Sequence, residues 1–192
     1  MSRDQELPLF LLQGVVVSSR VRLRLMGEDE LSVVAAFWSA AEVAGDFEWH
    51  GFRPAQQLRR RFEEDGLLSE DRGRLAIDID GACVGVVSWH RVRHGPNTAS
   101  WCWNIGVMLL PEHRGQGVGT EAHRLVADYL FETTPVKRLE AGTDVDNVAE
   151  QKALEKNGFV REGVLRAAQF RAGDWRDIAL YSLLRNEWAS QR

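Results

Sequence analysis

The segment of residues 107–120 constrains the fold of this chain more than any other stretch. An apolar run rich in strand-forming residues stops at Pro111, and glycines then stand at every second position from 115 to 119, before a long amphipathic segment. We therefore expect a strand, a glycine loop and a helix. The first turn of a helix leaves N–H groups unpaired and carries the positive end of the helix dipole, so bare glycine backbone there favours an approaching anion.

Comparison with known phosphate-binding motifs limits which anion this loop could bind. An ordinary glycine-rich strand-to-helix turn is the alternative, but three glycines together with Arg114 and Thr120 favour a binding loop. A Walker loop needs lysine after its last glycine, and Thr120 is followed by Glu121. The dinucleotide fingerprint needs glycine where Thr120 stands. Both of these nucleotide loops are therefore excluded.

Two motifs carry a resemblance to a known family. Arg114-x-x-Gly117-x-Gly119 resembles the cofactor signature of the GNAT superfamily of acyl-CoA-dependent N-acyltransferases. Residues 146–159, which end in Glu-Lys-Asn-Gly-Phe, are similar to the second cofactor helix of that family. The segments 162–166 and 175–184 resemble its RimJ/RimL-type branch. The resemblance covers roughly residues 19–188, which leaves an N-terminal extension at 1–18 and a C-terminal tail at 189–192.

The resemblance implies an α/β (α+β) GNAT fold in a single domain, with a mixed, splayed central sheet of about seven strands and helices on both faces. It implies acetyl-CoA as co-substrate and no metal. The loop would cradle the pyrophosphate, and the strand before it would pair with pantetheine, with one strand N–H available to polarise the thioester carbonyl. The cofactor-binding residues implied are Val107, Met108, Leu109, Arg114, Gly115, Gln116, Gly117, Val118, Gly119, Thr120 and Asn147.

Hydrophobic periodicity predicts the same order of elements. We expect a strand within residues 10–25, helices over 28–45 and 54–66, strands over 75–79 and 84–92 joined by a turn at Asp80-Gly81, a strand over 100–110, a helix from 118, a strand over 139–143, a helix over 147–157, and strands over 160–170 and 176–184. This order predicts a mixed sheet with helices on both faces.

Composition limits the class of protein. A chain of 192 residues fits one domain, and a net charge of −4 lacks the basic footprint of a nucleic-acid binder. No apolar run approaches the ~18 residues that cross a bilayer, and the acidic start does not fit a signal peptide. We expect a cytoplasmic monomer or homodimer with no membrane or nucleic-acid partner. Cys83 and Cys102 lack metal-ligand spacing, so we expect buried free thiols.

The general base is not evident from the motifs. Many Rim-type relatives carry a glutamate in the central strand where this chain has Asn104, and an amide cannot take a proton. The candidates are Glu48 and His50 in the loop between the first two helices, and His90 at the end of a strand. Direct transfer through a water relay is the alternative.

The second cofactor helix also departs from its relatives. Glu150 stands where the Rim-type branch usually has serine, and Leu154 where other branches have a tyrosine acid. We consider Glu150 a catalytic candidate, but a carboxylate in the first helical turn is stabilised as the anion, which favours a capping role. Asn147 fits both the N-cap, with Glu150 completing a capping box, and the pantetheine ligand.

Aromatic residues gather near the expected acceptor side. Trp49, Trp89 and Trp101, together with Asn104, are the candidate substrate-binding residues, although most tryptophans belong to the core. Two functions follow. The first is transfer of an acetyl group to a primary amine, either a protein N-terminal α-amine or a small amine such as a polyamine, an amino-acid derivative or an antibiotic. The second is a catalytically weak acyl-CoA-binding or regulatory protein.

Overall fold

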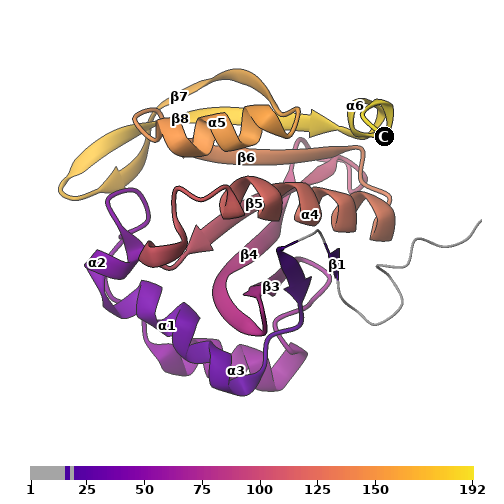
Figure 1. Cartoon of the computed structure of the whole chain (residues 1–192). Coiled ribbons are helices and arrows are strands. Elements are labelled where there is room, and N and C mark those ends of the chain that lie inside the picture. Colours follow the sequence, from indigo (N-terminus) through magenta and orange to yellow (C-terminus); the bar gives the residue numbers. More distant parts are fainter. Residues whose placement is uncertain (1–15, 18–19) are drawn as a thin grey trace, which may run out of the picture.

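The computed structural model describes residues 16–17 and 20–192. Its centre is one eight-stranded sheet with the order β1-β2-β3-β4-β5-β6-β8-β7 (Figure 1). The strands are β1 Val16–Val17, β2 Arg22–Arg24, β3 Arg72–Ile79, β4 Ala82–Arg93, β5 Trp101–Leu109, β6 Arg138–Asp144, β7 Val160–Arg171 and β8 Asp174–Leu184. Neighbouring strands are antiparallel except β5 and β6, which are parallel. The mixed sheet is confirmed, and the two-residue β1 brings the strand number to eight.

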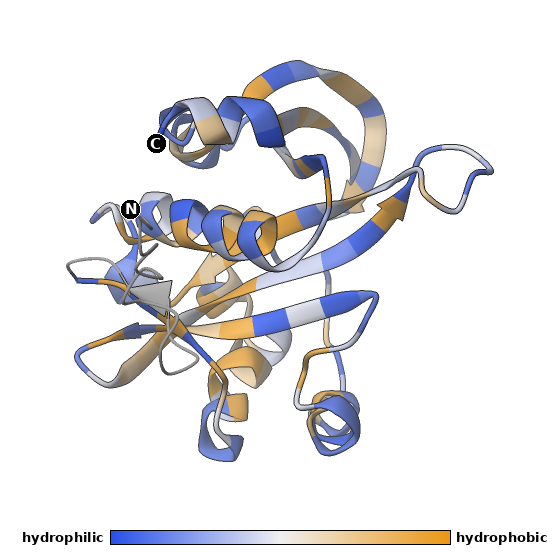
Figure 2. Ribbon diagram, turned by 90° about the vertical axis from the view of Figure 1, so that its right-hand side faces the viewer, coloured by the Kyte–Doolittle hydropathy of each residue, from blue (hydrophilic) through white to orange (hydrophobic). Residues whose placement is uncertain are grey.

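Helices cover both faces of the sheet, as Figure 2 shows from the side. The helices are η2 Glu28–Glu30, α1 Leu31–Ser39, α2 Ala41–Ala44, α3 Ala55–Asp65, η3 Pro111–His113, α4 Val118–Thr133, α5 Val148–Lys156 and α6 Arg185–Ser190. On one face, α1 and α3 bury Val34, Phe37 and Leu58 against the sheet. On the other face, α4 and α5 bury a larger core that includes Leu125 and Leu154. Burial of these two apolar faces is the main force that holds the layers together.

The sheet splays at its centre. β5 and β6 are paired only at Trp103↔Leu139 and Asn104↔Glu140. Beyond Asn104, β5 stays paired with β4 as far as Leu109 but has no β6 partner. The second edge of β5 is therefore unpaired just before the glycine loop, which confirms the splayed sheet.

Several boundaries differ from the sequence prediction. The helix expected over 28–45 is divided, because Ala40 is extended with φ −135° and ψ 114° and separates α1 from α2. Pro54 is the N-cap of α3 rather than its first helical residue. α6 was not expected; Trp188 anchors it by packing on Phe131 and donating from Nε1 to Asp128 at 2.8 Å. This helix extends into the expected tail at 189–192.

The predicted hairpin turn is confirmed. Asp80 and Gly81 both have positive φ values, 53° and 89°, which match the twist of the flanking strands. β3 begins at Arg72, three residues before its expected start, and this places Arg74 inside the sheet.

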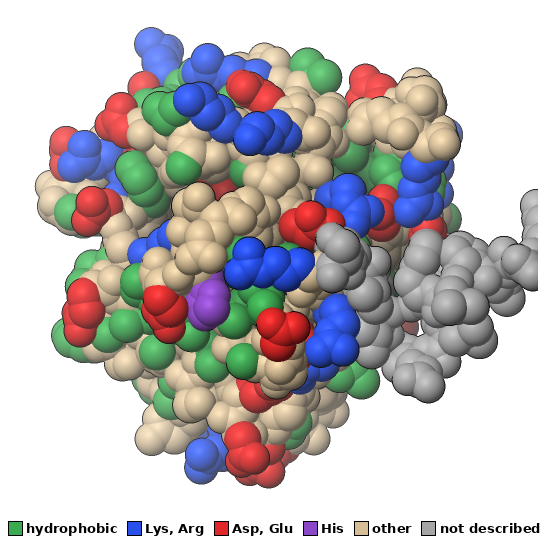
Figure 3. All heavy atoms as spheres, in the orientation of Figure 1, with side chains coloured by type: hydrophobic (Ala, Val, Ile, Leu, Met, Phe, Trp, Pro, Cys, Tyr) green, Lys and Arg blue, Asp and Glu red, His purple; other side chains and the backbone are tan. Residues whose placement is uncertain are grey.

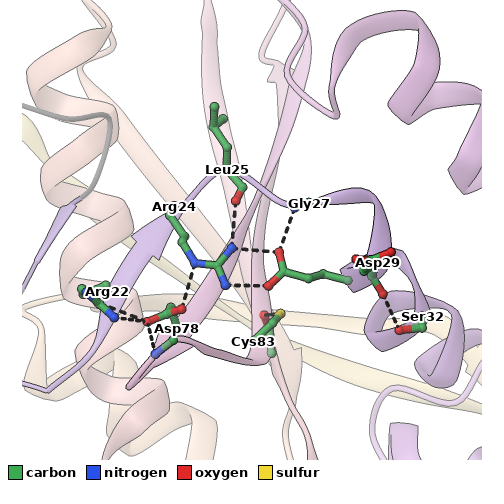
Figure 4. Close-up of polar contacts among 11 residues, drawn as sticks. Arg22, Arg24, Leu25, Gly27, Asp29, Ser32, Asp78 and Cys83 are labelled. Carbon is green, nitrogen blue, oxygen red and sulfur yellow. Dashed lines mark hydrogen bonds and ion pairs between the residues drawn. The ribbon is translucent and has the colours of Figure 1, made fainter.

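An ion-pair network joins the sheet edge to the helical layer. Asp78 on β3, only 1% exposed, accepts from Arg22 at 2.7 Å and from Arg24 at 2.8 Å, and Arg24 continues to Glu30 (Figure 4). Each buried charge in this network has a counter-ion, as low-dielectric surroundings require. Several half-buried arginines in the described part of the chain are paired with a carboxylate in the same way.

The surface matches the charge balance of the sequence. Acidic and basic side chains are interspersed over the face in Figure 3. In the part of the chain that the structure describes, no helix combines the length and hydrophobicity needed to cross a bilayer. Of the expected N-terminal extension at 1–18, only residues 16 and 17 belong to the described part. Cys83 and Cys102 are free thiols, as expected, and Cys102 is buried while Cys83 is half-buried.

Candidate active site

The glycine loop leaves the start of α4 open. Gly117 is the N-cap of α4 with φ 83°, and Gly115 has φ 71°; such values favour glycine. A Cβ atom at either position would meet nothing within 4 Å. No side-chain hydrogen bond caps the helix, so its first-turn N–H groups have no capping side-chain acceptor. Residues 115–120 thus leave an open helix start of the kind that can bind a phosphate group.

The side chain of Arg114 does not join this cradle. Its guanidinium donates to the carbonyls of Val43 and Ala44 at the end of α2, and to Leu109 at 2.9 Å at the end of β5. A Cβ atom at Gly45 would lie 2.9 Å from Arg114 Nη1, so this glycine permits the approach. Arg114 thus binds the helical layer to the central strand, and its expected role as a direct anion ligand is not what the structure shows.

The open edge of β5 presents backbone donors to the gap. Leu110 N–H donates to Val84 on β4 at 3.0 Å. Because successive residues of a strand direct their backbone groups to opposite edges, the N–H groups of Val107 and Leu109 point away from β4. They face the gap beside β6, where the resemblance places pantetheine. Val107, Met108 and Leu109 are half-buried at this open edge.

The first turn of α5 meets the middle of α4. Asn147 is the N-cap, and its side chain accepts from Glu150 N–H at 3.2 Å, which confirms the cap. The capping box does not close, because Asn147 N–H donates to Asp144 and the Glu150 carboxylate turns to His123. His123 Nε2 lies 2.6 Å from Glu150 Oε1, and His123 is fully buried.

A cavity lies under β5 on the face covered by α1. We name it the Glu48 cavity; its volume is about 200 Å³. Two of the four catalytic candidates, Glu48 and His50, line it from the loop between α2 and α3. The lining residues are Phe37, Trp38, Glu48, His50, Gly51, Arg53, Arg74, Ser88, Gly106, Val107 and Met108. The cavity therefore joins the candidate bases directly to the strand segment that the cofactor is expected to follow.

Glu48 has the protonation behaviour of a general base. Glu48 is an exposed residue, and the protein atoms around its carboxyl group desolvate that group only in part. This desolvation, with a smaller contribution from the nearby Glu150 carboxylate, raises the pKa of Glu48 to about 7, against opposing effects of Arg171, Arg53 and Arg114. The pKa of His50 moves the other way, lowered by desolvation and by Arg53 and Arg171. A carboxylate with a pKa near neutrality is suited to proton abstraction.

The tryptophan candidates lie outside the Glu48 cavity. Trp49 packs edge-on against Phe52, with ring centroids 5.2 Å apart. Trp89 is 5% exposed and lies against Tyr129 of α4, while Trp101 packs edge-on against Trp103. Alternation along β4 and β5 turns Trp89 and Trp101 toward the α4 face, away from the cavity. Asn104, half-buried on β5, also lies outside the lining residues.

The structure adds residues that the motifs did not indicate. His123 contacts Glu150, and Leu154, which the sequence analysis had singled out, is fully buried in the core. Arg171 at the end of β7 forms a buried ion pair with Asp144 and stacks over Phe47, the residue before Glu48, at 5.4 Å. Arg74 enters the cavity from β3. The sequence-based prediction missed Arg74 because it began this strand at residue 75, and the sequence carried no signal for His123 or Arg171.

Among the residues that the structure describes, one group outside the cavity has metal-binding potential. The ligand atoms of His94, Cys102 and Glu140 lie within 4.8 Å of one another, near the start of β5. Glu140 already accepts from Arg138 Nε at 2.7 Å, which offsets its charge. Burial and the adjacent carboxylate raise the pKa of the Cys102 thiol to about 12, so that the thiol is protonated at neutral pH.

Comparison with known proteins agrees with this geometry. Residues 20–160 match the family described as acetyltransferase (GNAT) domain. The probable N-acetyltransferase YjcK of Bacillus subtilis is 35% identical over 128 residues, 67% of each chain. The ribosomal-protein-serine acetyltransferase of Escherichia coli is 26% identical over 137 residues, 70% of this chain and 74% of the relative. Spermidine N-acetyltransferase from Vibrio cholerae, solved with CoA and spermine, has a TM-score of 0.75 at 16% identity, covering 90% of this chain and 99% of that one.

The open glycine loop at a helix start and the splayed strand beside it agree with the acetyltransferase domain that the family comparison finds, which makes this chain an acyl-CoA-dependent N-acyltransferase. The chain belongs to the GNAT acetyltransferase family, and its RimJ/RimL-type branch is represented among the relatives.

Proposed function

We propose that the protein transfers the acetyl group of acetyl-CoA to a primary amine that binds in the Glu48 cavity. The observation that carries this proposal is the position of Glu48, a carboxylate with a pKa of about 7 in a cavity whose wall includes the backbone of Gly106, Val107 and Met108. An amine in that cavity would lie between a base and the strand that the thioester follows. The acceptor class includes protein N-terminal α-amines and small amines.

In this proposal, backbone N–H groups bind the cofactor, and charged side chains do not. The N–H groups at the start of α4 would hold the pyrophosphate, and the unpaired edge of β5 would hold the pantetheine chain. Bound acetyl-CoA supplies the acetyl group and a thiolate leaving group. The N–H of Val107, directed into the gap, would stabilise negative charge on the thioester oxygen. Asn147 lies at the start of α5, where its amide side chain is the candidate pantetheine ligand besides being the N-cap.

Glu48 would act as the general base. An amine enters as an ammonium ion at neutral pH and must lose a proton before it attacks. Glu48 takes that proton in our proposal, because Asn104 cannot and because the Glu150 carboxylate is bound to His123. Glu48 thus supplies the group that the central strand lacks, and this favours an enzyme over a regulatory acyl-CoA-binding protein.

The test is turnover by Glu48→Gln. We expect its kcat to fall by on the order of 10²–10⁴ while the KM for acetyl-CoA changes little, because Gln keeps the shape but cannot accept the proton. Release of free thiol from acetyl-CoA in a panel of amines measures both constants. Glu64→Gln, at an exposed position of α3, is the matched control and should retain full activity. Equal activity of the two variants would refute the role of Glu48.

A further inference from the structure

Arg74 is a cation without a counter-ion. It lies on β3, and its Nε atom is buried with no hydrogen-bond partner. Within residues 20–192, no carboxylate forms an ion pair with it; its guanidinium instead stacks over the ring of Trp38 at 5.7 Å. A stacking contact satisfies none of the five guanidinium N–H donors. Arg74 therefore retains donor capacity that the protein itself does not use.

Most half-buried arginines in the described part of the chain have partners, although Arg176 also has a buried Nε atom without one. Arg24 has Asp78 and Glu30, Arg138 has Glu140 and Glu162, and Arg171 has Asp144. Arg185 donates to three backbone carbonyls. Against this pattern, Arg74 combines desolvation with repulsion from Arg61 and Arg53, which lowers its pKa to about 10. A desolvated charge left unpaired is costly for a folded protein, so a purely structural role does not explain Arg74.

The position of Arg74 gives it a ligand-facing role. Arg74 is paired in register with Ser88 on β4, and Ser88 with Gly106 on β5, so the three residues cross the sheet side by side. All three line the Glu48 cavity. Gly106 has no Cβ, and the site of one would lie 3.7 Å from Ser88 Oγ, so the space above this row stays open. An acceptor in the Glu48 cavity would therefore meet the guanidinium of Arg74, the hydroxyl of Ser88 and the open space above Gly106.

The charges around Arg74 are mostly positive. The Glu48 cavity contains Arg53 and Arg74 against a single carboxylate, Glu48. A second hollow of about 260 Å³ shares Arg74 and Ser88 with it, and adds Arg61 and Arg72 against Asp65. A polyamine needs several carboxylates, which this surface does not offer. An acceptor that carries its own negative charge would be complementary to it.

We propose that Arg74 binds an anionic group of the acceptor, so that the enzyme acetylates an amine that bears a nearby carboxylate rather than a polyamine. This inference rests on the proposed function, because it places the amine at Glu48 in the same cavity. The planar guanidinium fork matches a carboxylate with two parallel hydrogen bonds, and Ser88 adds a hydroxyl donor. A phosphate would satisfy the same fork, and the test separates the two anions.

The experiment compares acceptors that differ only in charge. Acetylation by the wild-type enzyme is measured with 4-aminobutyrate, its amide, butylamine, spermidine and an aminoalkyl phosphate. We expect kcat/KM for 4-aminobutyrate to exceed the value for its amide and for spermidine by at least about tenfold, because a site built for a charged partner rejects analogues that lack it. Preference for the phosphate over the carboxylate would identify phosphate as the anion and overturn the carboxylate assignment.

Arg74→Met provides the matched variant. It should lower kcat/KM for 4-aminobutyrate by about 10–100-fold, mainly through KM, and leave butylamine and the KM for acetyl-CoA unchanged. Its melting temperature should stay equal or rise, since the change removes an unpaired desolvated charge. Arg74→Lys should restore part of the activity, and Arg60→Gln on exposed α3 should change nothing. A purely structural Arg74 would instead give a lower melting temperature and a uniform loss on all amines.

The outcomes separate the two proposals. If uncharged amines and spermidine are acetylated as well as 4-aminobutyrate, and Arg74→Met affects them all alike, the anion subsite is wrong while the acetyltransferase proposal stands. Both proposals fail if two results are obtained together. The wild type acetylates none of the amines, and 4-aminobutyrate raises the melting temperature of the wild type no more than it raises that of Arg74→Met. Stabilisation of the wild type alone by 4-aminobutyrate, without turnover, would uphold the subsite and refute the proposed reaction.

Discussion

His123 Nε2 lies 2.6 Å from Glu150 Oε1, and this contact joins the buried middle of α4 to the first turn of α5. The two helices contribute the phosphate cradle and Asn147 respectively, so the contact sets the spacing of the two halves of the expected cofactor site. A second tie acts in parallel, because Asn157 Nδ2 at the end of α5 donates to the carbonyl of Thr120 at 2.9 Å. We therefore propose that Glu150 acts by positioning α5.

The first prediction concerns Glu150→Gln. The Gln side chain keeps an oxygen that can accept from His123, so we expect kcat to fall by less than about tenfold, against the roughly 10²–10⁴ expected of a group that transfers a proton. Glu150→Leu should lose the His123 contact, leave that buried imidazole unpaired and lower the melting temperature. Steady-state kinetics and thermal melts measure both effects. A collapse of kcat in Glu150→Gln, with normal cofactor affinity, would make Glu150 catalytic.

The second prediction is a pH profile. Glu48 acts as a base only when ionised, and its pKa is about 7, so kcat/KM for the acceptor should rise with pH through about 7 and then level off until the acceptor itself titrates. The measurement is initial rate between pH 5.5 and 9 at saturating acetyl-CoA. A profile that is flat across pH 6–8 would exclude Glu48 as the base.

The third prediction concerns stability and follows from the upward shift of the Glu48 pKa. The carboxyl pKa of Glu48 is raised on folding, so ionisation destabilises the folded state, and stability is lost as pH rises from the usual glutamate range through about 7. Glu48→Gln should therefore raise the melting temperature at pH 8 and leave it unchanged at pH 4. The exposed control Glu64→Gln should show no such pH-dependent gain.

The fourth prediction tests the glycine loop. Acetyl-CoA at 100 times its Kd should stabilise the wild type by about 2.7 kcal/mol, seen as a rise in melting temperature. Gly117→Val should abolish that rise but also strain the fold, because φ at 117 is 83°. Gly119 is helical, and a Cβ there would lie at an ordinary 3.6 Å from Leu109 Cδ1, so Gly119→Val should remove the rise with a smaller loss of stability.

A matched control completes the loop test. Gly163 lies on β7, has no positive φ, and a Cβ there would meet nothing within 4 Å. Gly163→Val should keep the full acetyl-CoA response. If both loop variants respond like this control, residues 115–120 do not bind the cofactor.

The fifth prediction concerns Arg114→Gln. The guanidinium contacts α2 and the end of β5, so its loss should destabilise the fold by about 1 kcal/mol and raise the KM of the acceptor, whose cavity these elements hold in place. The Kd of acetyl-CoA should change less than about threefold, because no direct phosphate contact is lost. A loss of cofactor affinity on the order of tenfold or more, measured by calorimetry, would restore Arg114 as an anion ligand.

Local sequence determined the scaffold of this protein. Glycines with positive φ at 115 and 117, the Asp80-Gly81 turn and the Asn147 cap are decided by the conformations that each residue and its nearest neighbours allow. The alternation of β5 and the periodicity of α4 likewise identify their buried faces before any fold is known. From these features the sequence predicted the cofactor-binding segments and the protein family.

Tertiary structure alone decided the acceptor side. The raised pKa of Glu48 depends on atoms that surround it and on Glu150, about a hundred residues away in sequence, and no local pattern reports such desolvation. The same holds for Arg74, which is unpaired only because the folded sheet leaves it no carboxylate, and for Arg114, whose acceptors lie on α2. Charges and hydrogen bonds act through space, so their partners become known only when distant segments are brought together.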